Sequence, residues 1–325
     1  MTHALIPPPV ARTSRGEPRR IGVEIEFHGP DVETTAAEVQ SLFGGRIEAT
    51  DPYRCNIEDT RFGAFTVELD SSLAHPEKSD DEDAPLTERV KAGLANLAGD
   101  VIGLWMPTEV CAPPVPIDRL PELQPLIDRL RARGAVGTRA SPAYGFGMQL
   151  NVEVAAETAE YVTRHLKAYL LLSDWLRADI KVDPTRRLLP YVDPFPRDYV
   201  LKVVDPDYAP DMKQLIDDYL DANPTRNREL DMLPLFAHLD SHRVADRFQG
   251  QSVKIKARPT FHYRLPNSLV DDPDWGGAVG EWNRWVRVEQ LAHDGDRLAE
   301  TGRAYRDHHA DELAGWIDWL RSKMP

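Results

Sequence analysis

Cysteine is scarce in this sequence, whose 325 residues include only Cys55 and Cys111, without CxxC spacing. This scarcity excludes a disulfide framework and a cysteine-rich zinc site, and it favours a reducing compartment. The chain also lacks an apolar run of transmembrane length, and its opening segment lacks the apolar centre of a secretory signal. We therefore expect a cytoplasmic protein without a membrane partner.

Basic residues are in deficit as well, because 53 Asp and Glu residues outnumber 39 Lys and Arg residues and give a formal charge of −14. No basic tract offsets this charge, which argues against nucleic acid as the main partner. A Walker loop and a GxGxxG motif are also missing, so a P-loop or Rossmann nucleotide site is not expected. The hydrophobic content of 42% and the charged content of 28% are typical of a globular protein.

The segment RRIGVEIEFHGP, residues 19–30, alternates apolar residues with two glutamates, Glu24 and Glu26. Residues two apart in an extended chain share a face, so this pattern predicts a strand whose two carboxylates stand about 6–7 Å apart. Two such charges repel unless water screens them or a cation lies between them. The pattern alone fits both a half-exposed strand of an antiparallel sheet and a metal site.

Other segments alternate in the same way and predict further strands within residues 64–73, 108–114, 144–154 and 253–268. Apolar residues at helical spacing, with capping residues or glycine and proline stops, predict helices near 31–45, 86–107, 120–134, 157–179, 210–222 and 227–240, and after residue 275. Strands and long helices follow one another without a βαβ rhythm. This order predicts an α+β fold built on a mainly antiparallel sheet with helices packed on one face.

The predicted strands each present polar side chains opposite their apolar residues. Acids occupy the early strands, amides a middle one and mostly cations the last one: Glu24, Glu26, Glu68 and Asp70, then Gln149 and Asn151, then Lys254, Lys256, Arg258, His262 and Arg264. If these strands are neighbours, the acids are placed to hold Mg²⁺ and the cations to hold phosphates. Such a face suits phosphoryl transfer, although solvated sheet surface explains any one strand by itself.

Six segments occur in an order and spacing that resembles the amidoligase family. They are RIGVEIEF, VELDSSL, TEVCAPP, RARGAV, GFGMQLNVEV and PTFHYRLPNS, and the resemblance covers about residues 19–154 and 253–292. Amidoligases belong to the glutamine synthetase and glutamate–cysteine ligase superfamily of ATP-dependent carboxylate–amine ligases. The resemblance implies a glutamine synthetase-like domain whose antiparallel sheet forms a funnel-like site. We accordingly expect a flexible lead-in at 1–18 and one catalytic domain at 19–325, with a helical insertion at about 181–250 and a helical C-terminus.

The resemblance also implies a set of metal ligands. Glu24 and Glu26 match the paired acids that bind the family's divalent ions, Mg²⁺ or Mn²⁺, and Glu109 matches the acid of its E-x-x-S-P-P segment. His262 and Arg264 fall where E-x-R is common. His262 is therefore the fourth candidate ligand, and it departs from the family pattern because an imidazole replaces a carboxylate.

Nucleotide contacts and catalytic groups follow from the same comparison. Gln149 and Asn151 fall where many members carry H-x-H. The residues implied to bind ATP are Gln149, Asn151, Lys254, Lys256, Arg258 and Arg264. Asp70 matches the D-x-S position of the family. The catalytic candidates are Glu68 or Asp70, as acceptor of the ammonium proton, and Arg264, as contact for the transferred phosphate.

The implied function is ATP- and Mg²⁺-dependent ligation of a small-molecule or peptide carboxylate to an amine through an acyl phosphate. Two alternatives remain compatible with the residues. The first is a non-catalytic scaffold of the same fold that binds a nucleotide or another anion. The second is a metal-dependent amide hydrolase, which would act without a nucleotide.

Overall fold

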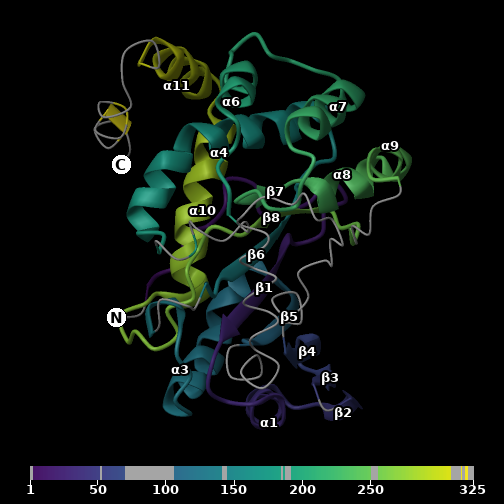
Figure 1. Ribbon diagram of the computed structural model, residues 1–325, viewed down its shortest axis with the longest axis vertical. Coiled ribbons are helices and arrows are strands. Elements are labelled where there is room, and N and C mark those ends of the chain that lie inside the picture. Colours follow the sequence, from purple (N-terminus) through teal and green to yellow (C-terminus); the bar gives the residue numbers. More distant parts are fainter. Residues whose placement is uncertain are drawn as a thin grey trace, which may run out of the picture.

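The computed structural model describes residues 3–51, 53–69, 106–140, 145–183, 186, 192–249, 255–308, 316 and 319–320. These residues contain one eight-stranded sheet in the order β2-β3-β4-β5-β1-β6-β8-β7 (Figure 1). The strands are β1 (Arg20–Phe27), β2 (Arg46–Asp51), β3 (Arg54–Thr60), β4 (Gly63–Leu69), β5 (Thr108–Pro116), β6 (Met148–Glu153), β7 (Leu230–Asp231) and β8 (Thr260–Tyr263). Every neighbouring pair is antiparallel, which confirms the predicted α+β class and sheet type.

Helices make up most of the remaining described chain. They are α1 (Val32–Phe43), α3 (Gln124–Ala132), α4 (Ala159–Ile180), α6 (Arg197–Val203), α7 (Met212–Ala222), α8 (Leu233–Leu239), α9 (Ser241–Arg247), α10 (Gly277–His293) and α11 (Gly295–His308), with 3-10 turns η2 (Ile117–Leu123) and η3 (Thr138–Ala140). Asp31 caps α1 by accepting a hydrogen bond from the Thr34 amide, as its position before the apolar stripe predicts. None of the described helices is long and apolar enough to cross a membrane.

The apolar face of the sheet is covered by helices. The side chains of Ile21, Val23, Ile25 and Phe27 along β1 are at most 4% exposed. Helix α1 packs on β3 and β4, and α10 lies beside α4 and contacts β6 (Figure 1). Trp285 of α10 contacts the aromatic rings of β8. The core therefore lies between sheet and helices, and the opposite face of β1 carries its glutamates.

The last predicted strand is shorter than its alternating sequence suggests. Regular pairing covers only Thr260–Tyr263, and residues 255–258 are not a strand. Pro259 has no amide hydrogen for the ladder, and the amide of Arg258 instead donates to the carbonyl of Pro234 (2.9 Å). The alternation of apolar and polar residues therefore starts in the sequence before the backbone pairing of β8 begins.

The predicted helix at 227–240 is wrong in its first part. Leu230 and Asp231 form β7, which pairs with Tyr263 and His262 at the sheet edge. Helix α8 starts only at Leu233, where a proline occupies its first turn. The expected insertion at about 181–250 therefore contributes a strand as well as helices. The predicted helix at 86–107 lies mostly outside the described residues, and β2 and β3 were not predicted.

The N-terminal segment, residues 3–18, lies against α10 and the end of β6. Trp282 donates from its indole nitrogen to the carbonyl of Ile6 (2.7 Å), and the amide of Ser14 donates to the carbonyl of Ala155 (2.8 Å). A cavity of about 440 Å³ opens between this segment, the start of α4 and the end of α10. None of the residues predicted as ligands or catalytic groups lines this cavity, so it is separate from the polar sheet face.

His165 of α4 is a buried titratable group beside this cavity. Its Nδ1 donates to the carbonyl of Tyr161 (2.8 Å). Burial lowers the pKa of His165 to about 4, and Arg19 and Arg164 act in the same direction, whereas Glu289 opposes them. The side chain is therefore neutral in the folded protein at neutral pH.

This burial predicts a pH-dependent loss of stability. The folded pKa of about 4 lies below the ordinary value of 6.5, so the unfolded chain binds more protons between these values and stability falls as the pH drops through them. We expect His165 to account for up to about 3 kcal/mol of that loss. Urea unfolding at a series of pH values should give a shallower slope for His165→Leu than for the wild type. Equal slopes between pH 4 and 6.5 would contradict the assignment.

Candidate functional site on the polar sheet face

Strand register brings three glutamates into one row across the sheet. Glu26 of β1 is directly opposite Glu109 of β5, and Glu109 is directly opposite Glu68 of β4. Directly paired residues of antiparallel strands project to the same face with their Cβ atoms about 4.5–5.5 Å apart. The row therefore gathers carboxylates from three sequence segments that were predicted separately.

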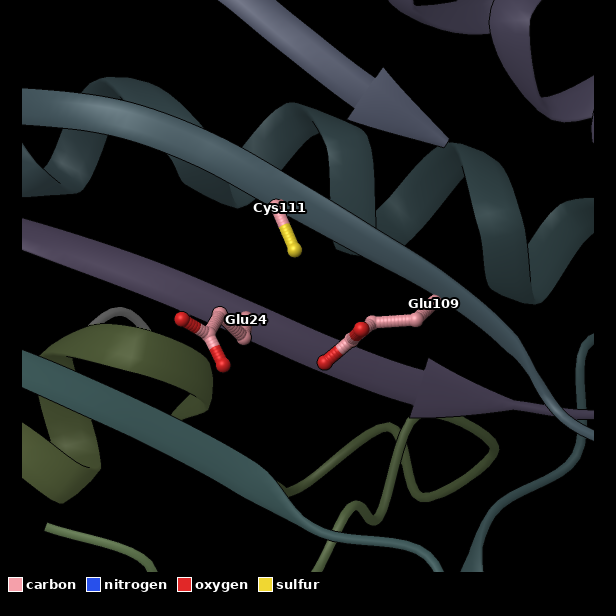
Figure 2. Close-up of side chains that lie close together, drawn as sticks. All are labelled: Glu24, Glu109 and Cys111. Carbon is pink, nitrogen blue, oxygen red and sulfur yellow. The ribbon is translucent and has the colours of Figure 1, made fainter. Parts of the chain in front are cut away.

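A second row lies one pleat away, around Glu24. Cys111 of β5 and Gln149 of β6 are the direct partners of Glu24 on its two sides. Oε1 of Glu24 accepts hydrogen bonds from Asn151 (2.8 Å) and from Nη1 of Arg258 (3.2 Å). Figure 2 shows the side chains of Glu24, Glu109 and Cys111 pointing into the same space in front of β1 and β5. Glu24 thus joins the acidic strands to the amide-bearing strand.

Glu26 is held in place by hydrogen bonds to both of its oxygens. Gln149 donates from Nε2 to Oε1 (3.0 Å), and the amide of Gly147 donates to Oε2 (2.8 Å). A side chain at position 147 would meet Arg186, whose Nη2 is 2.7 Å from the place of a Cβ atom. Glycine at 147 therefore allows the backbone to approach Glu26 while Arg186 packs behind it.

His262 extends the network toward the edge of the sheet. Its Nε2 is 2.6 Å from Oε1 of Gln149, and its Nδ1 is 3.7 Å from the carboxylate of Asp231 on β7. The amide nitrogen of Gln149 already faces Glu26, so its oxygen accepts and Nε2 of His262 donates. Burial lowers the pKa of His262, although Asp231 and Glu24 pull it upward.

Arginines lie on the side of the site away from β5. Arg258, about one third exposed, contacts both Glu24 and the Oδ1 atom of Asn151 (3.0 Å). Arg264 donates to the carbonyl of Arg226 (2.6 Å), and Arg226 in turn pairs with Asp231 (3.1 Å). The predicted separation of acids from cations along the sheet is therefore present in three dimensions.

The side chains of Glu24 and Cys111, which are directly opposite each other on β1 and β5, have shifted pKa values. Burial raises the pKa of Glu24, but His262, Arg258 and the hydrogen bond from Asn151 outweigh it and the net direction is downward. The carboxylate is therefore ionised at neutral pH. Burial also raises the pKa of the Cys111 thiol, and Glu109, Glu24 and Glu68 raise it further. Cys111 is accordingly a thiol, and not a thiolate nucleophile, while no cation is bound.

Most of the predicted site residues lie in this network. The polar face holds Glu24, Glu26, Glu68, Glu109, Gln149, Asn151, Arg258, His262 and Arg264. Lys256 is exposed, in the stretch before β8 that is not a strand. Asp70 and Lys254 lie outside the described residues, so their predicted roles stay predictions.

Sequence reasoning missed Asp231, Arg186 and the position of Cys111 in the site. Asp231 lies on a strand of two residues, too short for alternation to show, and its side chain is fully buried. Cys111 follows Glu109 at spacing two within a predicted extended segment, so the shared face could have been inferred. Arg186 has no signal of this kind, because its three acceptors are backbone carbonyls of residues 264–266.

The donor atoms of this face suit a divalent cation. One oxygen of Glu24, one of Glu109 and the sulfur of Cys111 lie within 4.8 Å of one another. Oε2 of the ionised Glu24 has no hydrogen-bond donor in the part of the chain that the structure describes, and Nε2 of His262 lies 4.0 Å from it. The Glu24 side chain is 14% exposed, so this oxygen is open to a ligand from solvent, and a cation is one ligand that it can take.

Comparison with known proteins identifies the chain at family level. No curated protein and no solved structure matches it. One family model, described as "Putative amidoligase enzyme", matches residues 17–287. The matched range includes every strand of the sheet and both rows of the polar face. The chain therefore belongs to the amidoligase family.

Proposed function

We propose that this protein is an ATP- and Mg²⁺-dependent carboxylate–amine ligase, with Mn²⁺ as an alternative ion. The observation that carries the proposal is the single sheet face that holds a row of three carboxylates and, one pleat away, Glu24 paired with Arg258, in a chain of the amidoligase family. Positioning and electrostatic stabilisation do most of the work in phosphoryl transfer, and a preorganised charged face supplies both. The proposal includes a glutamine synthetase-like domain with a funnel-like site and a cytoplasmic location.

The acidic residues would hold the divalent ion. Glu24 and Glu109 offer oxygens toward the same space, and Glu26 borders it from the neighbouring pleat. When bound, the ion would neutralise the charge of the ATP phosphates. Asn151 donates a hydrogen bond to Glu24, and Gln149 donates one to Glu26. These two hydrogen bonds set the direction in which each carboxylate points.

Other side chains of the face would bind substrates and move a proton. Arg258 and Arg264 would orient the transferred phosphate, as Arg side chains do in phosphate sites. A substrate carboxylate would take up the γ-phosphate, and an amine would then displace phosphate from the acyl group to give the amide. Glu68, at the end of the carboxylate row and about one third exposed, would accept the ammonium proton.

His262 has two roles open to it. As a metal ligand it would have to release Gln149, because its Nε2 donates to that amide oxygen. In the described arrangement it orients Gln149, which in turn orients Glu26. The hydrogen bond to Gln149 favours the orienting role for His262.

Lys256 is exposed at the surface, where it would contact ATP.

The proposal predicts ADP formation that depends on an acid substrate and on Mg²⁺ or Mn²⁺. The protein should release ADP from ATP when it is incubated with mixed amino acids or peptides. Hydroxylamine in place of the amine should trap the acyl phosphate as a hydroxamate, which mass spectrometry identifies. Binding of ATP without turnover in any mixture would contradict the ligase and support the scaffold. Amide cleavage without nucleotide would support the hydrolase.

A further inference from the structure

Cys111 places a sulfur atom among the carboxylates of the polar face. It lies on β5 directly opposite Glu24, and two residues beyond Glu109 on the same face. Its Sγ and one oxygen from each glutamate are mutually within 4.8 Å (Figure 2). This arrangement supplies three donor atoms from two adjacent strands, and neither glutamate was paired with a sulfur in the ligand set inferred from sequence.

The hydrogen bonds of Glu24 leave one of its two oxygens available to a ligand. Its Oε1 already accepts two hydrogen bonds, from Asn151 and Arg258, whereas no donor among the described residues reaches Oε2. The side chain is 14% exposed. This oxygen therefore stays open to a ligand from solvent, on the same side of the sheet as Glu109 and Cys111.

The sulfur decides which kind of cation binds most tightly. Mg²⁺ prefers six oxygen ligands, whereas thiolates select softer ions such as Zn²⁺ and Cd²⁺. Two carboxylates, one thiolate and an open fourth position are a ligand set that tetrahedral zinc accepts. We propose that Glu24, Glu109 and Cys111 form a site for a thiophilic divalent cation of the Zn²⁺ class.

Binding changes the chemistry of the cysteine and of the face. The S–H bond of Cys111 breaks, its proton passes to solvent, and a metal–sulfur bond forms without any change of oxidation state. The ion then occupies Glu24 and Glu109, the two carboxylates assigned to Mg²⁺. Zn²⁺ therefore inhibits the ligase by competition with Mg²⁺, and this consequence, unlike the binding itself, rests on the proposed function.

The second cysteine provides a matched control. Cys55 on β3 is directly opposite Val67 of β4, and it is buried in the hydrophobic core with 7% exposure. It lies on the apolar face of the sheet, where its direct cross-strand neighbours are Ala49 and Val67. Because the chain has only these two cysteines, any metal–thiolate signal belongs to one of them.

Titration of the purified protein with Cd²⁺, without ATP, tests the site. The ultraviolet charge-transfer band of a Cd–thiolate bond should grow to saturation at one ion per chain, and Cys55→Ala should retain it. Cys111→Ser should lose the band and bind Zn²⁺ about 100-fold more weakly in a competition with a chromogenic chelator. Glu109→Gln should weaken Cd²⁺ binding. In the wild type, Mg²⁺ at millimolar concentration should leave the Cd–thiolate band in place.

The possible results separate this inference from the ligase proposal. Absence of the band in the wild type, or its loss in Cys55→Ala and retention in Cys111→Ser, would overturn the site. A band with the expected assignment supports it even if no acid and amine pair gives turnover, since the titration uses neither. ADP release that Zn²⁺ does not inhibit, in protein that shows the band, would overturn the competition with Mg²⁺.

Discussion

Replacement of Glu24 by glutamine is expected to lower ATP-dependent turnover by about 1,000-fold, the upper range for loss of one preorganised electrostatic group. Glutamine has the same shape and can still accept from Asn151 and Arg258 through its oxygen. It lacks the negative charge that would hold the divalent ion. ADP release at saturating ATP and Mg²⁺ measures the effect, and the unfolding midpoint should change little because Arg258 is partly solvated.

A glutamate on the edge of the same sheet serves as the control for this variant. Glu48 on β2 is half exposed and forms an ion pair with Arg46 (2.6 Å). Glu48→Gln should therefore keep wild-type turnover. The double variant Glu24→Gln and Glu26→Gln should lose metal-dependent ATP binding altogether. Turnover by Glu24→Gln within twofold of the Glu48→Gln control would remove Glu24 from the metal site.

Replacement of Glu289 by alanine is expected to destabilise the protein by about 4 kcal/mol, because it leaves a buried charge without its partner. Arg19 donates from two nitrogens to the two oxygens of Glu289 (2.9 and 2.7 Å), and both side chains are at most 2% exposed. Trp285 also donates to Glu289 (3.0 Å). Urea unfolding at neutral pH gives the change in the free energy of unfolding.

Two comparisons test the cause of that loss. Glu160→Ala removes a carboxylate that is 81% exposed on α4, and it should change stability by less than about 0.5 kcal/mol. The double variant Arg19→Met and Glu289→Leu should recover much of the loss, since apolar residues of similar volume replace a buried ion pair well. A double variant as unstable as Glu289→Ala would show that packing, and not the uncompensated charge, explains the effect.

The local elements of this fold follow from short-range patterns, whereas their arrangement does not. Alternation predicted β1, β4, β5 and β6, because each strand buries one face and period two is then visible in the sequence. Strand β2 lies at the sheet edge with β3 beside it, and both alternate over only a few residues, as Ile47 does between Arg46 and Glu48, so the pattern was overlooked. Pro259 delays the start of β8 for a reason that is also local, the missing amide hydrogen.

The candidate site was predictable in its residues and not in its contacts. Glu24 and Asn151 are 127 residues apart, and only the pairing of β1 with β6 brings them together. The order of strands depends on long-range pairing that no window of sequence reports. The same limit explains why Asp231 was missed, since its burial depends on the edge position of β7 beside β8.

The pairing of Arg19 with Glu289 also bears on how the protein can be divided. The family match begins at residue 17 and ends at residue 287, so it contains the arginine and stops two residues short of its counterion. It also omits Ile6 and Val10, whose carbonyls accept from Trp282 and Arg19. A fragment limited to the matched range would thus leave the buried guanidinium group of Arg19 without its counterion, and we expect a stable fragment to need residues beyond that range at both ends.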